Sequence, residues 1–359
     1  MTLELSALGW SPFFEEQWQE WSGAGCIPAR IAAEHRGAYE VWSPAGRGAA
    51  QVAGRLRRAL AEGGLPAAGD WVAIDAPPGP DRPAQIRGLL QRRTLFTRLA
   101  AGRGARLQVV AANVDLVLAV CGLDADFNLR RIERYLARIG ASGARPLVVL
   151  NKADLAEEPA ARVREVVARI PGAEVLPCSA RRGDGVAALR ERIAPGTTAA
   201  LVGSSGAGKS TLVNALGGAE TMATGEVRAR DGRGQHVTTR RQLVELPGGG
   251  LLLDTPGMRE LQLAGEEGLE AAFEEVAALA AGCRFADCGH EGEPGCALQA
   301  ALEDGSLDPE RLEHFLRLGR EARAAERRRD ARLRRQDERA WGRLTGEAHR
   351  QMRRKRGEE

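Results

Sequence analysis

The residues from 203 to 210, Gly-Ser-Ser-Gly-Ala-Gly-Lys-Ser, have the spacing G-x-x-x-x-G-K-S of a phosphate-binding loop. An apolar segment, AALV, precedes them and a helix-forming segment, STLVNAL, follows, which is the context that this motif requires. The glycines allow backbone N–H groups to surround phosphates, and the helix N-terminus favours negative charge. We expect Lys209 to contact the β- and γ-phosphates and Ser210 to ligate magnesium. The alternative is a glycine-rich turn that binds nothing.

The tetrapeptide at 151–154, Asn-Lys-Ala-Asp, indicates which base is recognised. It follows the apolar segment PLVVL, so it lies at the carboxyl end of a strand, where α/β sheets bind ligands. The Asp154 carboxylate can accept from guanine N1–H and N2–H₂ together, whereas adenine would leave it unpaired. Further along, Cys-Ser-Ala at 178–180 matches the loop that contacts guanine O6 through backbone N–H groups in GTPases. These motifs favour GTP over ATP.

A third motif, Asp-Thr-Pro-Gly at 254–257, follows the apolar segment GLLL. We expect Asp254 to hold magnesium through water and the N–H of Gly257 to contact the γ-phosphate. Before it lies the segment 232–239, Gly-Arg-Gly-Gln-His-Val-Thr-Thr, whose glycines and polar residues indicate a flexible switch or an ordinary surface loop. One of its two threonines should complete the magnesium shell, and the sequence does not distinguish Thr238 from Thr239.

The order of these motifs differs from that of Ras-like GTPases, in which the phosphate loop precedes N-K-x-D. Here N-K-x-D and S-A come first, so we predict a circularly permuted GTPase domain, a rearrangement that works when the original termini lie close together at the surface. The predicted GTP site comprises Asn151, Lys152, Asp154, Ser179, Ala180, Gly203, Ser204, Ser205, Gly206, Ala207, Gly208, Lys209, Ser210, Thr211, Asp254 and Gly257. The predicted magnesium ligands are Ser210, Asp254, Thr238 and Thr239.

A cluster of metal-ligand type lies late in the chain, at Cys283, Cys288, His290 and Cys296. Three thiolates and one imidazole predict one closed, tetrahedral, structural zinc site, which would stabilise a small helical region. The alternatives are unliganded cysteines or a catalytic zinc, and four protein ligands disfavour the latter because no position stays open. We interpret the other cysteines as structural: Cys26, Cys121 and Cys178.

Three kinds of element must position these motifs. Five strand-like segments, CIPARIAAE, AYEVW, AAQVAGRLRR, GDWVAID and AQIRGLL, predict a small β-barrel, either an oligonucleotide/oligosaccharide-binding (OB) fold or another small β-domain. Continuous apolar runs that alternate with helical segments then predict a buried parallel α/β sheet. The last part is helical. The predicted domains are a leader at 1–24, an OB-fold domain at 25–104, a permuted GTPase domain at 105–264, and a helical zinc-binding domain with a basic C-terminal helix at 265–359.

The charges are unevenly distributed along the 359 residues. The net charge is +3, but residues 317–359 hold sixteen basic and eight acidic residues, which suggests a polyanionic partner or a solvated helix. Only three of the 51 basic residues are lysines, and two of these, Lys152 and Lys209, lie in the nucleotide motifs. Aromatic residues are sparse in the barrel, so we expect recognition of nucleic-acid backbone and shape rather than base stacking, with Tyr39, Trp42 and Trp71 as the candidates for stacking.

Targeting features are absent from the sequence. Neither a signal peptide nor an apolar run long enough to span a membrane occurs, so we expect a cytoplasmic protein with no membrane contact, and a monomer.

On the motif order, the QHxTT switch, the string Asp-Thr-Pro-Gly-x-Arg-Glu-Leu at 254–261 and the Cys/His cluster, the chain resembles the ribosome small-subunit-dependent GTPase A family. These are circularly permuted bacterial GTPases, and the resemblance covers nearly the whole chain. It implies an OB-fold, a permuted GTPase domain and a zinc domain. It also implies a role in late maturation of the small ribosomal subunit, whose binding stimulates the GTPase, and hence the small subunit and its rRNA as partners. Val237 stands where the family often has threonine.

The catalytic groups differ from the Ras-like pattern. Ras-like enzymes place a glutamine after D-x-x-G to orient water, but this chain has Met258 there. The family shares this hydrophobic residue, and the resemblance makes the switch histidine, His236, the catalytic candidate together with Lys209; a histidine that only shapes the switch is the alternative. Because of Met258, a nucleotide-gated RNA-binding scaffold with incidental hydrolysis is the competing function.

Overall fold

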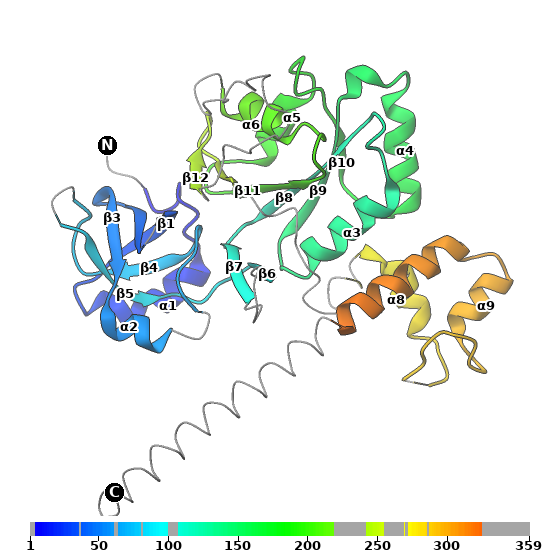
Figure 1. Ribbon diagram of the computed structural model, residues 1–359, viewed down its shortest axis with the longest axis horizontal. Helices are drawn as coiled ribbons and strands as arrows, with labels where there is room; N and C mark the ends of the chain where they lie inside the picture. Colours follow the sequence, from blue (N-terminus) through cyan, green and yellow to red (C-terminus); the bar gives the residue numbers. More distant parts are fainter. Residues whose placement is uncertain are drawn as a thin grey trace, which may run out of the picture.

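The computed structural model describes residues 4–35, 37–60, 64–79, 82–99, 107–218, 242–254, 269, 272–285 and 287–324. Figure 1 shows three bodies along the chain: a β-barrel (blue), an α/β domain (cyan to green) and a helical C-terminal domain (orange). Within the described residues no helix is both long and apolar enough to cross a bilayer.

The first body is a closed five-stranded barrel. Its strands are β1 (Ile27–His35), β2 (Ala38–Ser43), β3 (Gly46–Val52), β4 (Trp71–Ile74) and β5 (Ala84–Leu89). They follow the order β1-β2-β3-β5-β4, and a β1–β4 pairing closes the barrel. Aliphatic residues fill it, among them Ile31, Val41 and Ile86, each fully buried. The predicted barrel is therefore confirmed.

One expected strand of the barrel is partly wrong. The segment AAQVAGRLRR forms the end of β3 and then turns into helix α2 (Gly54–Ala59). Its arginines cause the difference, because Arg55, Arg57 and Arg58 are exposed, as a short surface helix allows and the interior of a barrel does not.

The leader packs against the barrel through aromatic rings. Helix α1 (Pro12–Ser22) carries Phe14, whose ring lies 5.8 Å from that of Trp71, and the Trp10 ring lies 4.7 Å from Trp71 edge-on. Beside them the buried Arg30 guanidinium donates to the carbonyl oxygens of Leu8, Gly69 and Asn113. This side chain joins the leader, the barrel and the first residues of the α/β domain.

The second body is a predominantly parallel sheet. Its parallel strands are β8 (Leu116–Gly122), β9 (Arg145–Asn151), β10 (Val175–Pro177), β11 (Thr198–Gly203) and β13 (Leu251–Asp254), in the order β10-β9-β8-β11-β13. Helices α3 (Leu129–Gly140), α4 (Pro159–Arg169), α5 (Val186–Arg192) and α6 (Lys209–Gly217) connect them. Leu118 of β8 clusters with side chains of α5 and α6, whereas Cys121 clusters with those of α3, so both faces of the sheet are covered (Figure 1).

The barrel and the parallel sheet are continuous. Strand β12 (Gln242–Glu245) runs antiparallel to β13 and also pairs with β1 of the barrel, where Gln242 lies opposite Ala33. A separate hairpin of β6 (Leu95–Leu99) and β7 (Leu107–Ala112) connects the two bodies in sequence.

The third body contains α8 (Glu274–Ala280), α9 (Ala297–Glu303) and a helix at 309–324. Its apolar residues, including Phe273 and Leu298, share one core cluster with Ile132 and Leu136 of α3. The C-terminal domain therefore packs directly against the α/β domain. Most of the predicted basic tail, residues 325–359, lies outside the described residues.

Candidate active site and metal centre

The loop 203–208 forms a tight turn between β11 and α6. Gly203 and Gly208 have φ values of 154° and 87°, which side chains with a Cβ rarely adopt. A Cβ at Gly203 would lie 2.4 Å from the carbonyl oxygen of Val120, and one at Gly208 would lie 2.3 Å from the Asn151 amide nitrogen. Both glycines are therefore required by local conformation and by close packing, as expected of a phosphate loop.

Lys209 is held against this loop. Its ammonium donates to the carbonyl oxygen of Gly203 over 2.8 Å and to that of Ser204. Helix α6 begins at Lys209, so its N-terminus directly adjoins the loop, and a helix N-terminus presents backbone donors to an anion. The arrangement offers a cation and backbone donors to an anion.

The side chain of Asn151 connects two of the predicted motifs. Its amide nitrogen donates to the carbonyl oxygen of Ala207 over 2.9 Å, and its oxygen accepts from the N–H of Ala180 over 3.0 Å. Asn151 is 2 % exposed, so both bonds are sheltered from water. The phosphate loop and the 178–180 loop are thereby placed side by side, as the sequence predicts for one nucleotide site.

Asp154 and Ser179 meet at the rim of the same region. The Ser179 hydroxyl donates to Asp154 Oδ1 over 2.6 Å, and this hydrogen bond holds the pKa of the Asp154 carboxyl below its ordinary value. Asp154 is therefore ionised at neutral pH and keeps acceptor capacity for a ligand, as recognition of guanine requires.

A partner of Lys152 was missed by the sequence reasoning. The Lys152 ammonium donates to Asp124 Oδ2 over 2.6 Å, and that contact lowers the pKa of the Asp124 carboxyl. Two residues further on, the Asp126 carboxylate accepts from the Ser204 hydroxyl, whose oxygen lies 2.6 Å from each carboxylate oxygen. The available signal was the string Gly122-Leu-Asp-Ala-Asp, which places two carboxylates at the carboxyl end of a buried strand.

The predicted magnesium groups are only partly described. Strands β11 and β13 are parallel neighbours, so the ends that carry the phosphate loop and Asp254 lie at one edge of the sheet. Ser210 lies exposed in the first turn of α6 at that edge. The side chain of Asp254 and the predicted site residues His236, Thr238, Thr239 and Gly257, as well as Met258, lie outside the described residues.

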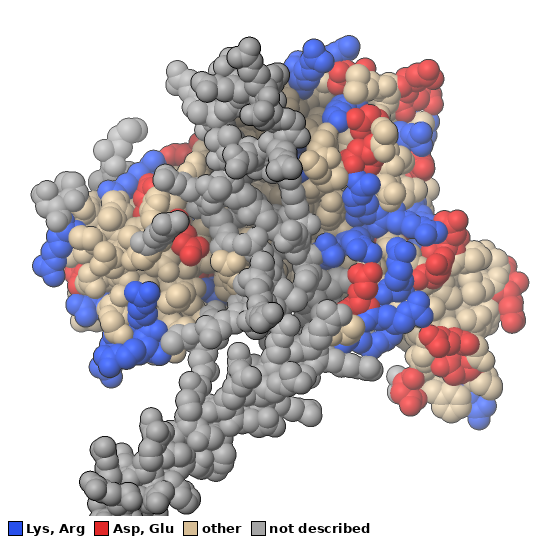
Figure 2. All heavy atoms as spheres, viewed as in Figure 1, with Lys and Arg blue, Asp and Glu red and all other residues tan. Residues whose placement is uncertain are grey.

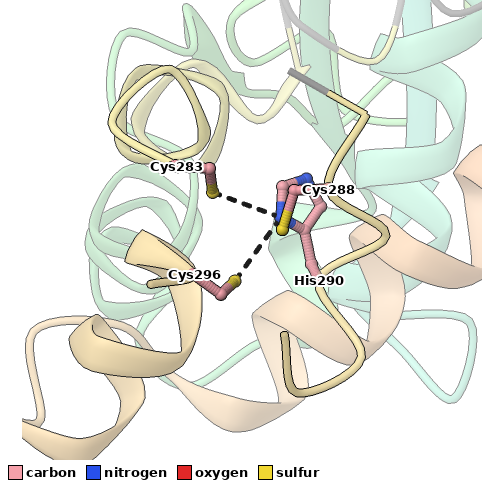
Figure 3. Close-up of side chains that lie close together, drawn as sticks. All are labelled: Cys283, Cys288, His290 and Cys296. Carbon is pink, nitrogen blue, oxygen red and sulfur yellow. Dashed lines mark hydrogen bonds between the residues drawn. The ribbon is translucent and has the colours of Figure 1, made fainter. Parts of the chain in front are cut away.

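The four predicted zinc ligands converge. One candidate ligand atom from each of Cys283, Cys288, His290 and Cys296 lies within 4.8 Å of all the others. His290 Nδ1 is 3.5 Å from Cys283 Sγ and 3.6 Å from Cys296 Sγ (Figure 3). Three soft sulfur donors and one imidazole nitrogen suit a tetrahedral metal ion such as zinc. The cluster could hold a metal ion, and its donor set fits zinc.

Two further interactions set the shape of this cluster. His290 has a φ of 61°, and its carbonyl oxygen accepts from the Gln299 side chain of α9 over 3.0 Å. The N–H of Ala297, at the start of α9, donates to Cys283 Sγ over 3.4 Å. Helix α9 thus supports the ligands from outside the cluster, as surrounding hydrogen bonds do in metal sites.

Two of the remaining cysteines, Cys121 and Cys178, are buried. Burial raises the pKa of the Cys121 thiol to about 11, and burial likewise raises that of Cys178 to about 11. Thiols of this kind are protonated at neutral pH and are poor nucleophiles. The structural interpretation of both agrees with this environment.

Comparison with known proteins places the chain in a family. Residues 89–264 match the sequence model of a family described as RsgA GTPase. A protein of Opitutus terrae named small ribosomal subunit biogenesis GTPase RsgA is 48 % identical over 355 residues, which cover 95 % of this chain and 96 % of that protein. The chain belongs to the RsgA GTPase family. A protein of the same name from Syntrophotalea carbinolica is 45 % identical, with 88 % of each chain covered.

Solved structures support the same family assignment. The crystal structure of YjeQ from Thermotoga maritima superposes with a TM-score of 0.62 and 26 % identity, covering 83 % of this chain and 98 % of that one. YloQ, described as a circularly permuted GTPase, superposes with a TM-score of 0.60 and 25 % identity over 83 % and 96 % of the two chains. The family resemblance, the GTPase activity and the circular permutation that the sequence predicts are thereby confirmed.

Proposed function

We propose that the chain binds GTP in the loops described above, hydrolyses it to GDP and phosphate, and acts in late maturation of the small ribosomal subunit, which stimulates the hydrolysis. The observation that carries the nucleotide assignment is the double contact of Asn151 with Ala207 and Ala180. The names of the curated relatives support the ribosomal role.

Each described group has a proposed task at the nucleotide. Backbone N–H groups of the loop 203–208 and of the first turn of α6 receive the phosphates. Lys209 moves its donors from the loop carbonyls to the β- and γ-phosphates and stabilises charge there. Asp154 accepts from the guanine N1–H and amino group, and the backbone at 179–180 donates to O6. An adenine base would leave the Asp154 carboxylate without a donor.

Magnesium and the attacking water are assigned to the remaining motif residues. Ser210, Asp254 and one of Thr238 and Thr239 offer the oxygen ligands that magnesium prefers. Held by these residues, magnesium would supply positive charge that offsets the negative charge of the phosphates. We assign orientation of the water to His236, because Met258 has no hydrogen-bonding group. If His236 only shaped the switch, its replacement would alter nucleotide binding instead of turnover.

The Cys/His cluster is proposed to hold one structural zinc ion per chain. Four protein donors fill a tetrahedral shell, so the ion would have no open position for a substrate. Its proposed role is to hold the loop at 283–296 against α8 and α9. Both helices are short, so their apolar packing alone provides little stabilisation, and bound metal would add to it.

The barrel offers a surface for rRNA. Arg55, Arg57 and Arg58 of α2 are exposed, and Figure 2 shows basic side chains at this end of the barrel. The three aromatic residues expected as stacking candidates are buried, with Tyr39, Trp42 and Trp71 being 8 %, 5 % and 0 % exposed. We therefore propose that the barrel contacts phosphates and not stacked bases. We further propose that the protein acts as a cytoplasmic monomer.

The experiment that tests this function compares GTP turnover of the purified protein with and without purified small ribosomal subunits. We expect slow turnover alone and an increase of orders of magnitude with subunits, as for other GTPases whose active site is completed in trans. Added salt should reduce the stimulation, because basic contacts to rRNA release counterions. Lys209→Ala removes the cation proposed to contact the phosphates, and it serves as the control that should not hydrolyse GTP. Absence of stimulation in the wild type would contradict the ribosomal role, and subunit binding without hydrolysis would favour the scaffold function.

A further inference from the structure

The loop between β8 and α3, residues 122–128, contains several hydrogen bonds of its own. The N–H of Gly122 donates to Asp126 Oδ2 over 3.2 Å, and the N–H of Asp126 donates to Asp124 Oδ1 over 3.1 Å. The Asn128 side chain caps α3 by accepting from the N–H of Arg131 over 2.9 Å. The loop is thus a short connection with internal hydrogen bonds at the carboxyl edge of the sheet.

From this loop two carboxylates reach the two nucleotide motifs. Asp124 accepts from Lys152 of the N-K-x-D motif, and Asp126 accepts from Ser204 of the phosphate loop. The N–H of Leu123 also donates to the carbonyl oxygen of Asn151 over 2.8 Å. One loop that belongs to no recognised motif therefore supports both the base-recognising and the phosphate-binding segments.

The Asp126–Ser204 contact is short and sheltered. Both carboxylate oxygens lie 2.6 Å from the Ser204 hydroxyl, and the Asp126 side chain is 14 % exposed. A hydroxyl that donates to a carboxylate forms a stronger bond than one between neutral groups. The carbonyl oxygen of Ser204 in turn accepts from the Lys209 ammonium, so Asp126, Ser204 and Lys209 form a continuous chain of contacts.

A carboxylate beside a phosphate site would repel the ligand unless its charge is balanced. Arg131, in the first turn of α3, pairs with Asp126 Oδ1 and supplies that balance. The Arg131 guanidinium thus balances the charge of the carboxylate that accepts from the phosphate loop, and both groups contact Asp126 Oδ1.

We propose that Asp126 is a positioning residue that holds the phosphate loop, through the Ser204 hydroxyl, in the conformation that receives nucleotide. This inference rests on the nucleotide site proposed above and adds to it a residue outside the nucleotide motifs. A preformed loop avoids the cost of ordering its backbone on binding. The contact is the same in the GTP-bound state and in the transition state. Its loss therefore weakens nucleotide binding and leaves kcat unchanged.

The test uses Asp126→Ala, Ser204→Ala and the double variant in the full-length protein. Dissociation constants for GDP and GTP should rise about 10-fold in Asp126→Ala, the scale of a lost hydrogen bond to a charged group, while kcat at saturating GTP stays near wild type. The double variant should bind no more weakly than Asp126→Ala alone, because both single changes remove the same contact. Asp126→Asn, whose amide oxygen can still accept from Ser204, should recover part of the affinity.

Controls separate this proposal from the assignment of the site itself. Glu191→Ala removes an exposed carboxylate of α5 and should bind GDP like the wild type. Lys209→Ala should lose nucleotide binding; if it binds normally, the nucleotide site is wrong, whatever Asp126 does. If folded Asp126→Ala or Ser204→Ala binds GDP like the wild type, or if their effects add in the double variant, the positioning role is overturned. Should Asp126→Ala fail to fold, Ser204→Ala alone decides, since it leaves the Asp126–Arg131 pair in place.

Discussion

Arg311 of the C-terminal domain donates to the buried carboxylate of Glu133 in α3, with Nη1 lying 2.6 Å from Oε1. The same carboxylate accepts from Arg169 Nε of α4 over 2.9 Å and contacts His314 Nδ1. Glu133 is fully buried, and Arg311 and His314 are 3 % and 2 % exposed. A single carboxylate thus joins two helices of the GTPase domain to the helix at 309–324.

This junction also contains exposed ion pairs. Arg130 and Arg134 of α3 lie 3.2 Å from Glu310 and 3.1 Å from Glu321. Figure 2 shows basic side chains gathered over the region of α3 and α4, beside the C-terminal domain. Helix α3 follows the loop that contacts Ser204 and Lys152. The C-terminal domain therefore packs on the helix that follows the proposed nucleotide site.

Glu133→Ala should destabilise the junction strongly. The change leaves the buried Arg311 and His314 without their acceptor, and breaking a buried pair in this way costs about 3–5 kcal/mol. Denaturant unfolding of the purified protein measures the loss. The matched control is Glu321→Ala, which removes an exposed partner at the same helix junction and should cost below about 1 kcal/mol. Equal losses for the two variants would contradict the central role of Glu133.

The junction should weaken in acid. Burial alone would raise the pKa of Glu133, but the hydrogen bond from His314 and the charge of Arg311 outweigh it and hold that pKa below its ordinary value of 4.5. A lowered folded-state pKa means that the stabilisation is complete above pH 4.5 and is lost as the pH falls through the folded-state pKa. Arg169 and, through Arg311, Glu275 are the other charged groups at the carboxylate. Unfolding free energies measured between neutral pH and pH 3 should fall more steeply for the wild type than for Glu133→Gln, and parallel curves would refute this.

Asp154→Asn should change the base that is bound. The amide offers a donor to the 2-oxo group of xanthine and removes an acceptor for guanine, so GTP should bind more weakly and xanthosine triphosphate more tightly. Loss of the hydrogen bonds to the carboxylate should weaken GTP binding by about 10-fold or more. Competition between the two nucleotides measures the change. Wild-type protein that binds ATP as tightly as GTP would rule out the assignment of Asp154.

The purified protein should contain about one zinc ion per chain, as one closed four-ligand shell predicts. Elemental analysis tests the content. Cys288→Ala should lose the ion and disorder the C-terminal domain while the GTPase domain still binds GDP, whereas Cys26→Ala, outside the cluster, should keep the ion. Protease digestion before and after chelation reports the folding of the domain. A metal-free protein that resists protease throughout residues 283–296 would contradict a structural zinc.

His236→Ala should lose most of the subunit-stimulated turnover, by about 100-fold if the histidine orients the water. GTP affinity and subunit binding should stay near wild type, because the lost interaction would be made only in the transition state. Single-turnover hydrolysis with excess subunits separates the two effects. Wild-type stimulated turnover in this variant would remove His236 from the mechanism.

Features that depend on short stretches of sequence were predictable. Neighbouring backbone positions the atoms of the phosphate loop, of the Asn151–Asp154 motif and of the cysteine cluster. Residue type and spacing were therefore sufficient to predict these features. The buried strands around Leu118 and Leu252 were equally clear, because continuous apolar runs have few other stable arrangements. The strand expected beyond Val52 was wrong because the apolar residues Val52 and Leu56 fit a strand end and a short helix equally well, and the exposed arginines between and after them favour the surface helix.

The sequence by itself determined the candidate nucleotide-binding loops, their permuted order and the four candidate metal ligands, because each is a local pattern with its own chemical requirement. Only the tertiary structure decided which distant groups meet them. The Asp126–Ser204 contact joins residues 78 positions apart, and the Glu133–Arg311 contact joins residues 178 positions apart. Such pairs depend on how parallel strands align their ends and on how the C-terminal helices pack against α3. Packing of this kind arises from the whole apolar core, so it cannot be predicted from the spacing of residues in one short segment.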